Sequence, residues 1–151
     1  MHIIRGWAIA LFAWVCWFAF DQSCKAYFFT TQHPFSFFAG WIQSIQHYNY
    51  GIAFNIPIPQ LIILIITLIA CVGVFWAIQR AAQAGQILRC LFLGILLGGA
   101  LGNAFDRAAF GYVRDWLLLW HHSAINIADI GVIIGLLGAI SSRHQNTPQL
   151  H

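Results

Sequence analysis

Four long hydrophobic runs divide the chain, and more polar stretches separate them. A helix needs about 20 mostly apolar residues to cross a hydrocarbon core of about 30 Å. Two runs, 61–78 and 87–105, are long enough by themselves, whereas 6–20 and 127–140 need flanking polar residues at membrane depth. The pattern therefore predicts four transmembrane helices, at about 6–24, 61–79, 87–105 and 126–141.

The distribution of basic residues predicts how these helices are oriented. Lys and Arg are enriched in loops on the cytoplasmic side of a membrane. In a four-helix arrangement, one side carries Arg5, Arg80, Arg89 and Arg143, and the other carries Lys25, Arg107 and Arg114. We therefore expect both termini to be cytoplasmic, and the segments 25–60 and 106–125 to face outward. The first of these is too long for a bare connection and is rich in aromatic residues, so short strands or an interfacial helix are expected there.

Composition agrees with an integral membrane protein that forms one domain over residues 1–151. The chain is 60% hydrophobic and only 7% charged, with a net charge of +3. Such a small charge, without a basic stripe, argues against nucleic acid as a partner. The first run is expected to be a retained helix rather than a cleaved leader, since further hydrophobic runs follow it. The four Cys lack C-x-x-C spacing, so neither disulfides nor a zinc site is predicted.

The acidic residues are the most informative part of the sequence. The chain contains no Glu, and its four Asp are Asp21, Asp106, Asp115 and Asp129. An ionisable group near hydrocarbon is costly, so its presence suggests a function. In the predicted topology all four lie at the outer ends of helices or in the second outer loop. They are therefore expected to form one site at the outer membrane face.

Each Asp also has a structural interpretation. Asp21 and Lys25 are spaced for an i, i+4 ion pair, in which Lys25 would extend to the membrane surface. Asp129 stands in the first turn of a helix that Asn126 would cap. Asp115 has Arg114 beside it as a candidate partner.

The third helix carries two further patterns. Gly94, Gly98 and Gly102 form a stripe that allows close packing of a neighbouring helix, as do Gly131 and Gly135 in the fourth. After this stripe, Asn103, Asp106 and Arg107 share a helix face by their spacing. Asp106 and Arg107 could pair with each other, or Asn103 and Arg107 could hold a peptide backbone.

Two neighbouring Asp carboxylates suggest aspartyl proteolysis. Like charges at close range cannot both ionise, so the pair shares one proton and can act as acid and base together. Metal-assisted hydrolysis with His121 and His122 is an alternative, but the chain contains no H-E-x-x-H pattern. An ion or proton transporter would instead be expected to carry acids at the membrane midplane.

Five segments, in order along the chain, resemble motifs of the bacterial lipoprotein signal peptidase (signal peptidase II) family. The segment 21–25 resembles D-Q-x-[ST]-K, and 49–55 resembles N-x-G-A-A-F-S. The segments 98–107, 113–116 and 125–129 resemble G-G-A-x-G-N-x-x-D-R, V-x-D-[FW] and F-N-x-A-D. The chain departs from these patterns at Cys24, Ile52 and Asn55, and its interval from Asp115 to Asp129 is short for the family.

The resemblance implies an all-α membrane protein of four helices with a small outward-facing subdomain. It implies an aspartyl endopeptidase of the bacterial inner membrane, with its active site at the periplasmic face. The substrate would be a diacylglyceryl-modified prolipoprotein, cleaved before the lipidated cysteine. We expect a monomer in contact with membrane lipid, without cofactor or metal. A non-catalytic protein that binds lipidated peptides in the same place is the main alternative.

The resemblance also assigns roles to residues. The catalytic pair would be Asp115 and Asp129. The residues at substrate-binding or site-supporting positions would be Asp21, Lys25, Asn49, Gly51, Asn103, Asp106, Arg107 and Asn126.

Overall fold

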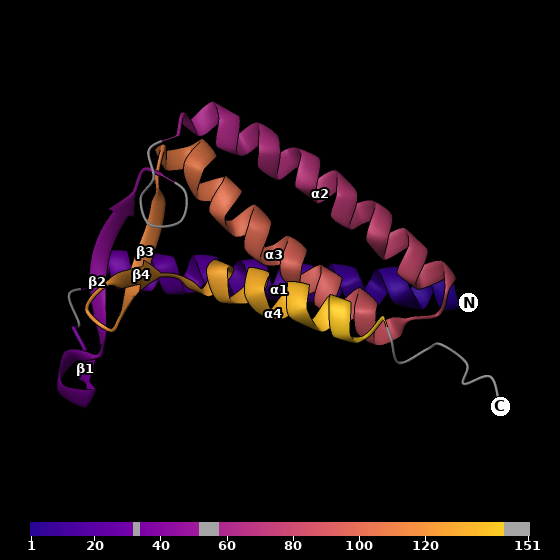
Figure 1. The fold of residues 1–151 in the computed structure, drawn as a ribbon, viewed down its shortest axis with the longest axis horizontal. Helices are drawn as coiled ribbons and strands as arrows, with labels where there is room; N and C mark the ends of the chain where they lie inside the picture. Colours follow the sequence, from indigo (N-terminus) through magenta and orange to yellow (C-terminus); the bar gives the residue numbers. More distant parts are fainter. Residues whose placement is uncertain (32–33, 52–57, 144–151) are drawn as a thin grey trace.

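The computed structural model describes residues 1–31, 34–51 and 58–143 as a bundle of helices with a small sheet across one end (Figure 1). The helices are α1 (His2–Thr30), α2 (Gln60–Gln83), α3 (Ile87–Phe110) and α4 (Ile127–Ser141), with a short 3-10 helix η1 (Phe38–Gly40). The strands are β1 (Ser36–Phe37), β2 (Ile42–Asn49), β3 (Val113–Leu119) and β4 (Ser123–Ile125). The motif residues Ile52 and Asn55 lie outside the described residues.

Three of the helices have the length and composition to cross a membrane, among the residues described. These are α1, α2 and α3, and the apolar α4 is shorter, with 15 residues. At 1.5 Å per residue α4 extends over about 22 Å, less than a typical hydrocarbon core of about 30 Å. By its own length α4 therefore spans only part of such a core.

Two helices are longer at the ends near the sheet than the hydrophobic runs predict. α1 continues to Thr30, because no Gly or Pro interrupts 21–30, and Lys25 lies within the helix with its side chain buried. α3 continues to Phe110 and ends where Gly111 adopts a left-handed conformation, with φ of 80°. Glycine is favoured at this position because it has no Cβ to clash there. Hydrophobicity alone underestimates both helices, since their last turns carry the polar residues of the site.

Close approach of helices explains the glycine stripes. A Cβ atom at Gly94 would collide with the backbone of Ala10 in α1, and one at Gly98 with that of Trp14. On another side of α3, a Cβ at Gly99 would collide with Ala128 of α4. α3 is therefore the central helix, in backbone contact with α1 and α4, as the small-residue spacing predicts.

The helix α2 packs more loosely. Its most buried residues, Ile78, Ala81 and Ala82, lie in its last two turns. Figure 1 shows that the end of α2 lies beside the start of α1, at the end of the bundle that carries the N-terminus, and that α2 diverges from α1 and α4 toward the end that carries the sheet. The start of α1 and the end of α4 lie at the same end of the bundle, opposite the sheet.

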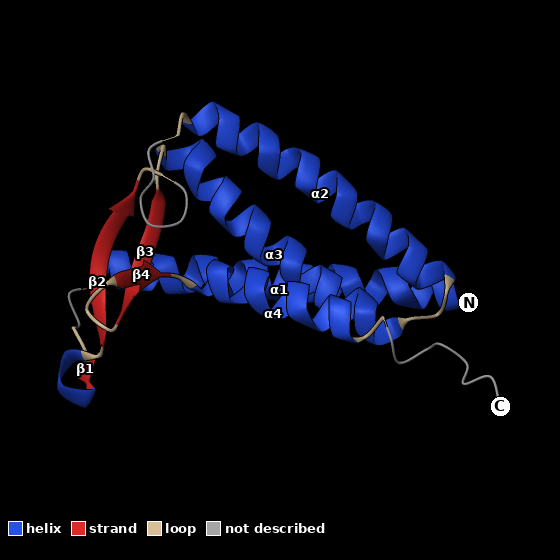
Figure 2. Cartoon of the chain, viewed as in Figure 1, coloured by secondary structure: helices blue, strands red, loops and turns tan. Residues whose placement is uncertain are grey.

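The sheet is antiparallel with the strand order β1-β2-β3-β4 (Figure 2). It combines the segments 25–60 and 106–125, because β2 from the first pairs with β3 from the second. The register places His47 opposite Asp115 and Asn49 opposite Val113. Strands were expected only between the first two helices. The segment 106–125 adds β3 and β4, because the exposed edge of β2 can form hydrogen bonds with a strand distant in sequence.

Candidate active site

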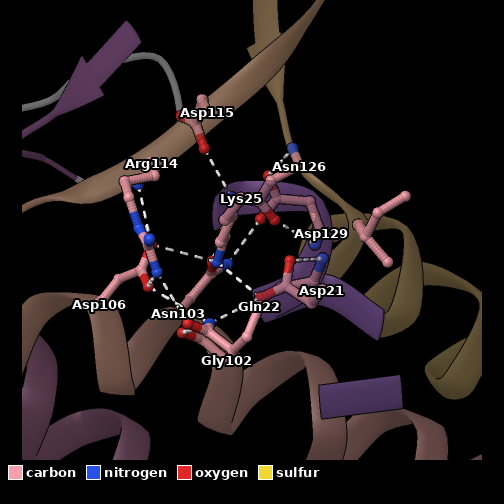
Figure 3. Close-up of polar contacts among 12 residues, drawn as sticks. Asp21, Gln22, Lys25, Gly102, Asn103, Asp106, Arg114, Asp115, Asn126 and Asp129 are labelled. Carbon is pink, nitrogen blue, oxygen red and sulfur yellow. Dashed lines mark hydrogen bonds and ion pairs between the residues drawn. The ribbon is translucent and has the colours of Figure 1, made fainter. Parts of the chain in front are cut away.

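All four Asp residues gather where the sheet crosses the helix ends (Figure 3). Three of them, Asp21, Asp106 and Asp115, are at most 1% exposed, and Asp129 is half-buried. They come from α1, α3, β3 and α4. Buried carboxylates need partners that hydrogen-bond or carry opposite charge. The partners found here divide into an ionic cluster and an amide network.

The ionic cluster is centred on Lys25. Its Nζ lies 2.8 Å from Asp21 Oδ2 and 3.3 Å from Asp106 Oδ2. It also donates a hydrogen bond of 2.9 Å to Asn103 Oδ1. The i, i+4 pair with Asp21 is present, but the Lys25 side chain is fully buried and does not extend to the surface. That interpretation was wrong, because a second acid and an amide from α3 surround the ammonium group.

The start of α4 is built from a capping box. The Asn126 side chain accepts a hydrogen bond of 3.0 Å from the backbone N–H of Asp129. In return, Asp129 Oδ2 accepts one of 3.2 Å from the Asn126 backbone N–H. The Ala128 N–H donates to Asp21 Oδ1 at 2.8 Å, which joins this helix start to α1. The N-cap prediction is therefore met, and it orients one carboxylate of the site.

Two asparagine amides connect the two remaining carboxylates. Asn126 Nδ2 donates to Asp115 Oδ1 at 2.6 Å and to Asn103 Oδ1 at 3.1 Å. Asn103 Nδ2 donates to Asp129 Oδ1 at 2.8 Å. An ammonium group has only donors, so Lys25 fixes which side of the Asn103 amide carries the oxygen. The amide nitrogen must then point at Asp129, and Lys25 thereby determines the hydrogen bond to that acid.

A third asparagine and an arginine complete the surroundings of Asp115. Asn49 Nδ2 donates to Asp115 Oδ2 at 3.0 Å, and Asn49 Oδ1 accepts from the Gly51 N–H at 3.0 Å. Arg107 Nη2 donates to the Gly51 carbonyl at 2.9 Å, and Nη1 to the Asn103 carbonyl at 3.4 Å. Arg107 thus holds a backbone segment of its own chain and does not form an ion pair with Asp106.

Burial is the main cause of an unusual ionisation of Asp115. Together with the nearby Asp129 charge, it raises the pKa of this carboxyl to about 7, against the hydrogen bonds from Asn49 and Asn126. A carboxyl with this pKa is protonated in about half of the molecules at pH 7. The arrangement can therefore hold one proton between two acids, as general acid–base chemistry at neutral pH requires.

Sequence reasoning did not identify Gln22 and Arg114 as site residues. Gln22 lies within the first motif and contacts both Asp21 and Asp106. Arg114 pairs with Asp106 at 2.8 Å and not with its neighbour Asp115. The motif pattern could have indicated Gln22. The position of Arg114 is open in the pattern V-x-D-[FW], so no signal in the sequence marked it.

The alternative metal site lacks a suitable donor set. Within the described ranges, no three His, Cys, Asp or Glu side chains gather as metal ligands would. His121 and His122 are exposed in the turn between β3 and β4, beyond Leu119 at the end of β3. Asp115 stands four residues before that end, about 13 Å along an extended strand.

Comparison with known proteins agrees with this geometry. The family model of signal peptidase II matches residues 13–143. A lipoprotein signal peptidase of Bacillus velezensis is 38% identical over 97 residues, which is 61% of this chain and 63% of the relative. One of Methylorubrum extorquens is 29% identical over 163 aligned positions, covering 99% of this chain and 91% of the relative.

Solved structures show the same fold. One bacterial membrane enzyme superposes with a TM-score of 0.81 at 25% identity, covering 94% of this chain and 91% of that one. Another superposes with a TM-score of 0.78 at 26% identity, covering 91% and 94%. The predicted fold class, a helical membrane protein with a small additional subdomain, is confirmed. The chain belongs to the signal peptidase II family.

Proposed function

We propose that the protein is an aspartyl endopeptidase that removes signal peptides from diacylglyceryl-modified prolipoproteins, with Asp115 and Asp129 as its catalytic pair. The observation that supports this best is the amide network, in which Asn103 and Asn126 connect the two carboxylates. The raised pKa of Asp115, about 7, adds a proton that the pair can share near neutral pH.

In the proposed reaction, the ionised carboxylate of the pair takes a proton from a water molecule, and the water oxygen attacks the scissile carbonyl carbon. The protonated carboxyl donates a hydrogen bond to the carbonyl oxygen and stabilises the negative charge that develops there. Collapse of the tetrahedral intermediate breaks the C–N bond, and a carboxyl group gives its proton to the leaving amine. Both acids are then ready for another cycle, so no cofactor is consumed.

The neighbours of the pair suit these roles. Each oxygen of Asp115 accepts one hydrogen bond, from Asn49 or Asn126, and each oxygen of Asp129 accepts one, from Asn103 or the Asn126 backbone. These donors orient both carboxyl groups before substrate arrives, which reduces the cost of reorganisation in the transition state.

The position of the site supports a lipidated substrate. Asp21, Asp106 and Asp129 lie in the halves of α1, α3 and α4 that are nearer the sheet, and Asp115 lies in the sheet itself. A peptide held in the membrane by acyl chains presents the bond next to its lipid anchor at this depth. The lipoprotein signal peptidases named above agree with this substrate class.

The assay that tests the function incubates the purified protein in detergent with a diacylglyceryl-modified prolipoprotein. Cleavage appears as a gel shift, and mass spectrometry of the product should find the lipidated cysteine at its new N-terminus. The same reaction with a strong chelator should proceed unchanged. Binding of the prolipoprotein without any cleavage would instead support a non-catalytic binding protein.

The membrane orientation can be tested in cells by cysteine labelling, in a variant whose native cysteines are replaced. Ser123 lies in the sheet and Arg143 is exposed after α4, at opposite ends of the bundle. A membrane-impermeant reagent should label Ser123→Cys in intact cells and Arg143→Cys only after permeabilisation, as the basic residues predict. Labelling of Arg143→Cys from outside would reverse the orientation.

The pH dependence of cleavage follows from the raised pKa of Asp115. Above about 7 the pair loses the proton that it shares, so kcat should fall as pH rises through this value. The measurement is a pH profile of kcat at saturating substrate. A kcat that stays constant up to about pH 9, well above that pKa, would contradict the shared proton.

The same group has a consequence for stability, measurable without substrate. The pKa of Asp115 is higher in the folded protein than its ordinary value of 3.8, so the folded state binds more protons than the unfolded state between about 4 and 7. Stability should therefore decrease with rising pH across this window, by at most about 1.4 kcal/mol per pH unit from this group. The variant Asp115→Asn should lack this contribution to the slope.

A further inference from the structure

Arg114 makes several contacts in this site beyond its ion pair with Asp106. Its Nη2 lies 2.8 Å from Asp106 Oδ1 and donates to Gln22 Oε1 at 2.8 Å. Its Nε and its backbone N–H both donate to Asp106 Oδ2, at 3.3 Å and 3.0 Å. The guanidinium carbon lies 4.5 Å from the centre of the Phe110 ring. One residue thus joins β3 to α1 and α3, directly before Asp115 in the chain (Figure 3).

Charge balance in the ionic cluster depends on this residue. The cluster contains two acids, Asp21 and Asp106, and two cations, Lys25 and Arg114. The side chains of the first three are completely buried, and that of Arg114 is 12% exposed. Without Arg114, both acids would compete for the single ammonium group. A buried charge without its partner is strongly unfavourable, so the ammonium would be drawn toward Asp106.

Such a shift would reach the proposed catalytic pair through Asn103. Lys25 holds the Asn103 oxygen, which directs the amide nitrogen to Asp129. An ammonium group that moves toward Asp106 weakens its hold on that oxygen. The amide could then rotate, and Asp129 would lose one of the two donors that orient it.

We propose that Arg114 is a positioning residue for the Asp115–Asp129 pair, which acts by neutralising Asp106 and by fastening the start of β3 to the end of α3. This inference rests on the proposed function, because the pair it positions is the proposed catalytic pair. The Arg114 side chain donates its hydrogen bonds to Asp106 and Gln22 and not to the pair, so it does not take part in proton transfer.

The guanidinium group is suited to this role in a way that an ammonium group is not. Its planar fork contacts both oxygens of Asp106, and Nη2 at the same time reaches Gln22. A lysine has one charged nitrogen and cannot bind these three atoms in the same geometry. It would still neutralise Asp106, so Arg114→Lys separates the effect of charge from the effect of geometry.

The test measures cleavage by Arg114→Gln, Arg114→Lys and the double variant Arg114→Gln/Asp106→Asn. Arg80→Gln is the matched control, because Arg80 stacks on Trp76 at the far end of α2. Arg114→Gln should lower kcat about tenfold to a hundredfold, as small displacements of catalytic groups do, with KM changed less than about threefold. The double variant should recover most of the loss, and Arg114→Lys should be intermediate.

The pH profile adds a signature that a purely structural role would not produce. Removal of the Arg114 cation makes the ionisation of the nearby Asp115–Asp129 pair less favourable. The pH profile of Arg114→Gln should therefore move to higher pH, and that of the double variant should return to the wild-type position because its net charge is unchanged. Arg80→Gln should match wild type in kcat, KM and pH profile.

Several outcomes would overturn the inference. They are a wild-type kcat in Arg114→Gln, or an equal loss in the single and double variants without any shift of the pH profile. If Arg114→Gln does not fold, as judged by thermal unfolding in detergent, Arg114→Lys takes its place, and a wild-type kcat in Arg114→Lys would overturn the inference. A wild-type protein that binds the prolipoprotein without cleaving it would instead refute the proposed function, and the inference with it.

Discussion

Asp115→Asn and Asp129→Asn should each abolish cleavage of a prolipoprotein while the protein remains folded in the membrane. Asn preserves the shape of the side chain, but it can neither take a proton from water nor return one to the leaving amine. The remaining acid no longer has a partner with which to share a proton, so the acid and base roles cannot be divided. General acid–base effects of this kind are worth roughly 10² to 10⁴ in rate. The measurement is single-turnover cleavage in detergent.

The fold of these variants needs its own readout, because both side chains belong to the amide network. In Asp115→Asn the new amide nitrogen would face a donor, either Asn49 or Asn126, and one hydrogen bond of about 1 kcal/mol would be lost. Thermal unfolding near pH 4, where the pH-dependent contribution of Asp115 is absent, should show this small loss and no more. Asp106→Asn is the informative comparison, since it should lower stability and keep some turnover. Cleavage at the wild-type rate by either folded variant of the pair would refute the aspartyl mechanism.

Lys25→Met should be among the most destabilising single substitutions in the chain. Met fills a similar volume but removes the ammonium group that contacts Asp21, Asp106 and Asn103. Asp106 would keep Arg114, whereas Asp21 would lose its only ion pair among the described residues and remain buried. Loss of one partner from a buried ion pair costs about 3–5 kcal/mol. Chemical unfolding in detergent measures this change, and cleavage should fall with it because Asn103 is released.

Two further variants determine whether loss of charge pairing causes the lower stability of Lys25→Met. In Lys25→Met/Asp21→Asn the uncompensated acid is also removed, so part of the lost stability should return. Arg143→Met removes an exposed cation beyond α4 and should change stability by less than about 0.5 kcal/mol. A double variant that is less stable than Lys25→Met would show that packing of the lysine chain, and not its charge, is the main contribution.

The ionic cluster and the proposed catalytic pair are consecutive parts of one hydrogen-bonded network. Lys25 contacts Asn103, and Asn103 contacts Asp129 and Asn126. The groups that bind α1, α3 and α4 to one another therefore also orient the acids. Substitutions in this network are therefore expected to lower both stability and cleavage. The effect on cleavage should be larger for residues closer to the pair.

Features with a local cause follow from the sequence alone. The hydrophobic runs predict the helices, because a continuous stretch of about 20 apolar residues can cross the hydrocarbon core without a partner distant in sequence. The spacing from Asn126 to Asp129 places the acid in the first turn of α4, since a capping box needs only residues three apart. The glycine stripe predicts close helix contacts, because helical periodicity alone determines which residues share a face. Family resemblance supplied the proposed pair.

The tertiary structure decides what depends on partners distant in sequence. Pairing of β2 with β3 brings Asn49 to Asp115, although 66 positions separate them. Lys25 is buried because α3 supplies Asp106 and Asn103 around it, which the i, i+4 spacing within α1 cannot reveal. Arg114 has two acids near it, Asp115 next in the chain and Asp106 from α3. It binds Asp106, because only that carboxylate lies within hydrogen-bond distance of its guanidinium group. Local spacing determines which side chains share a face of a helix or strand, whereas the packing of these elements determines which charged groups the side chains contact.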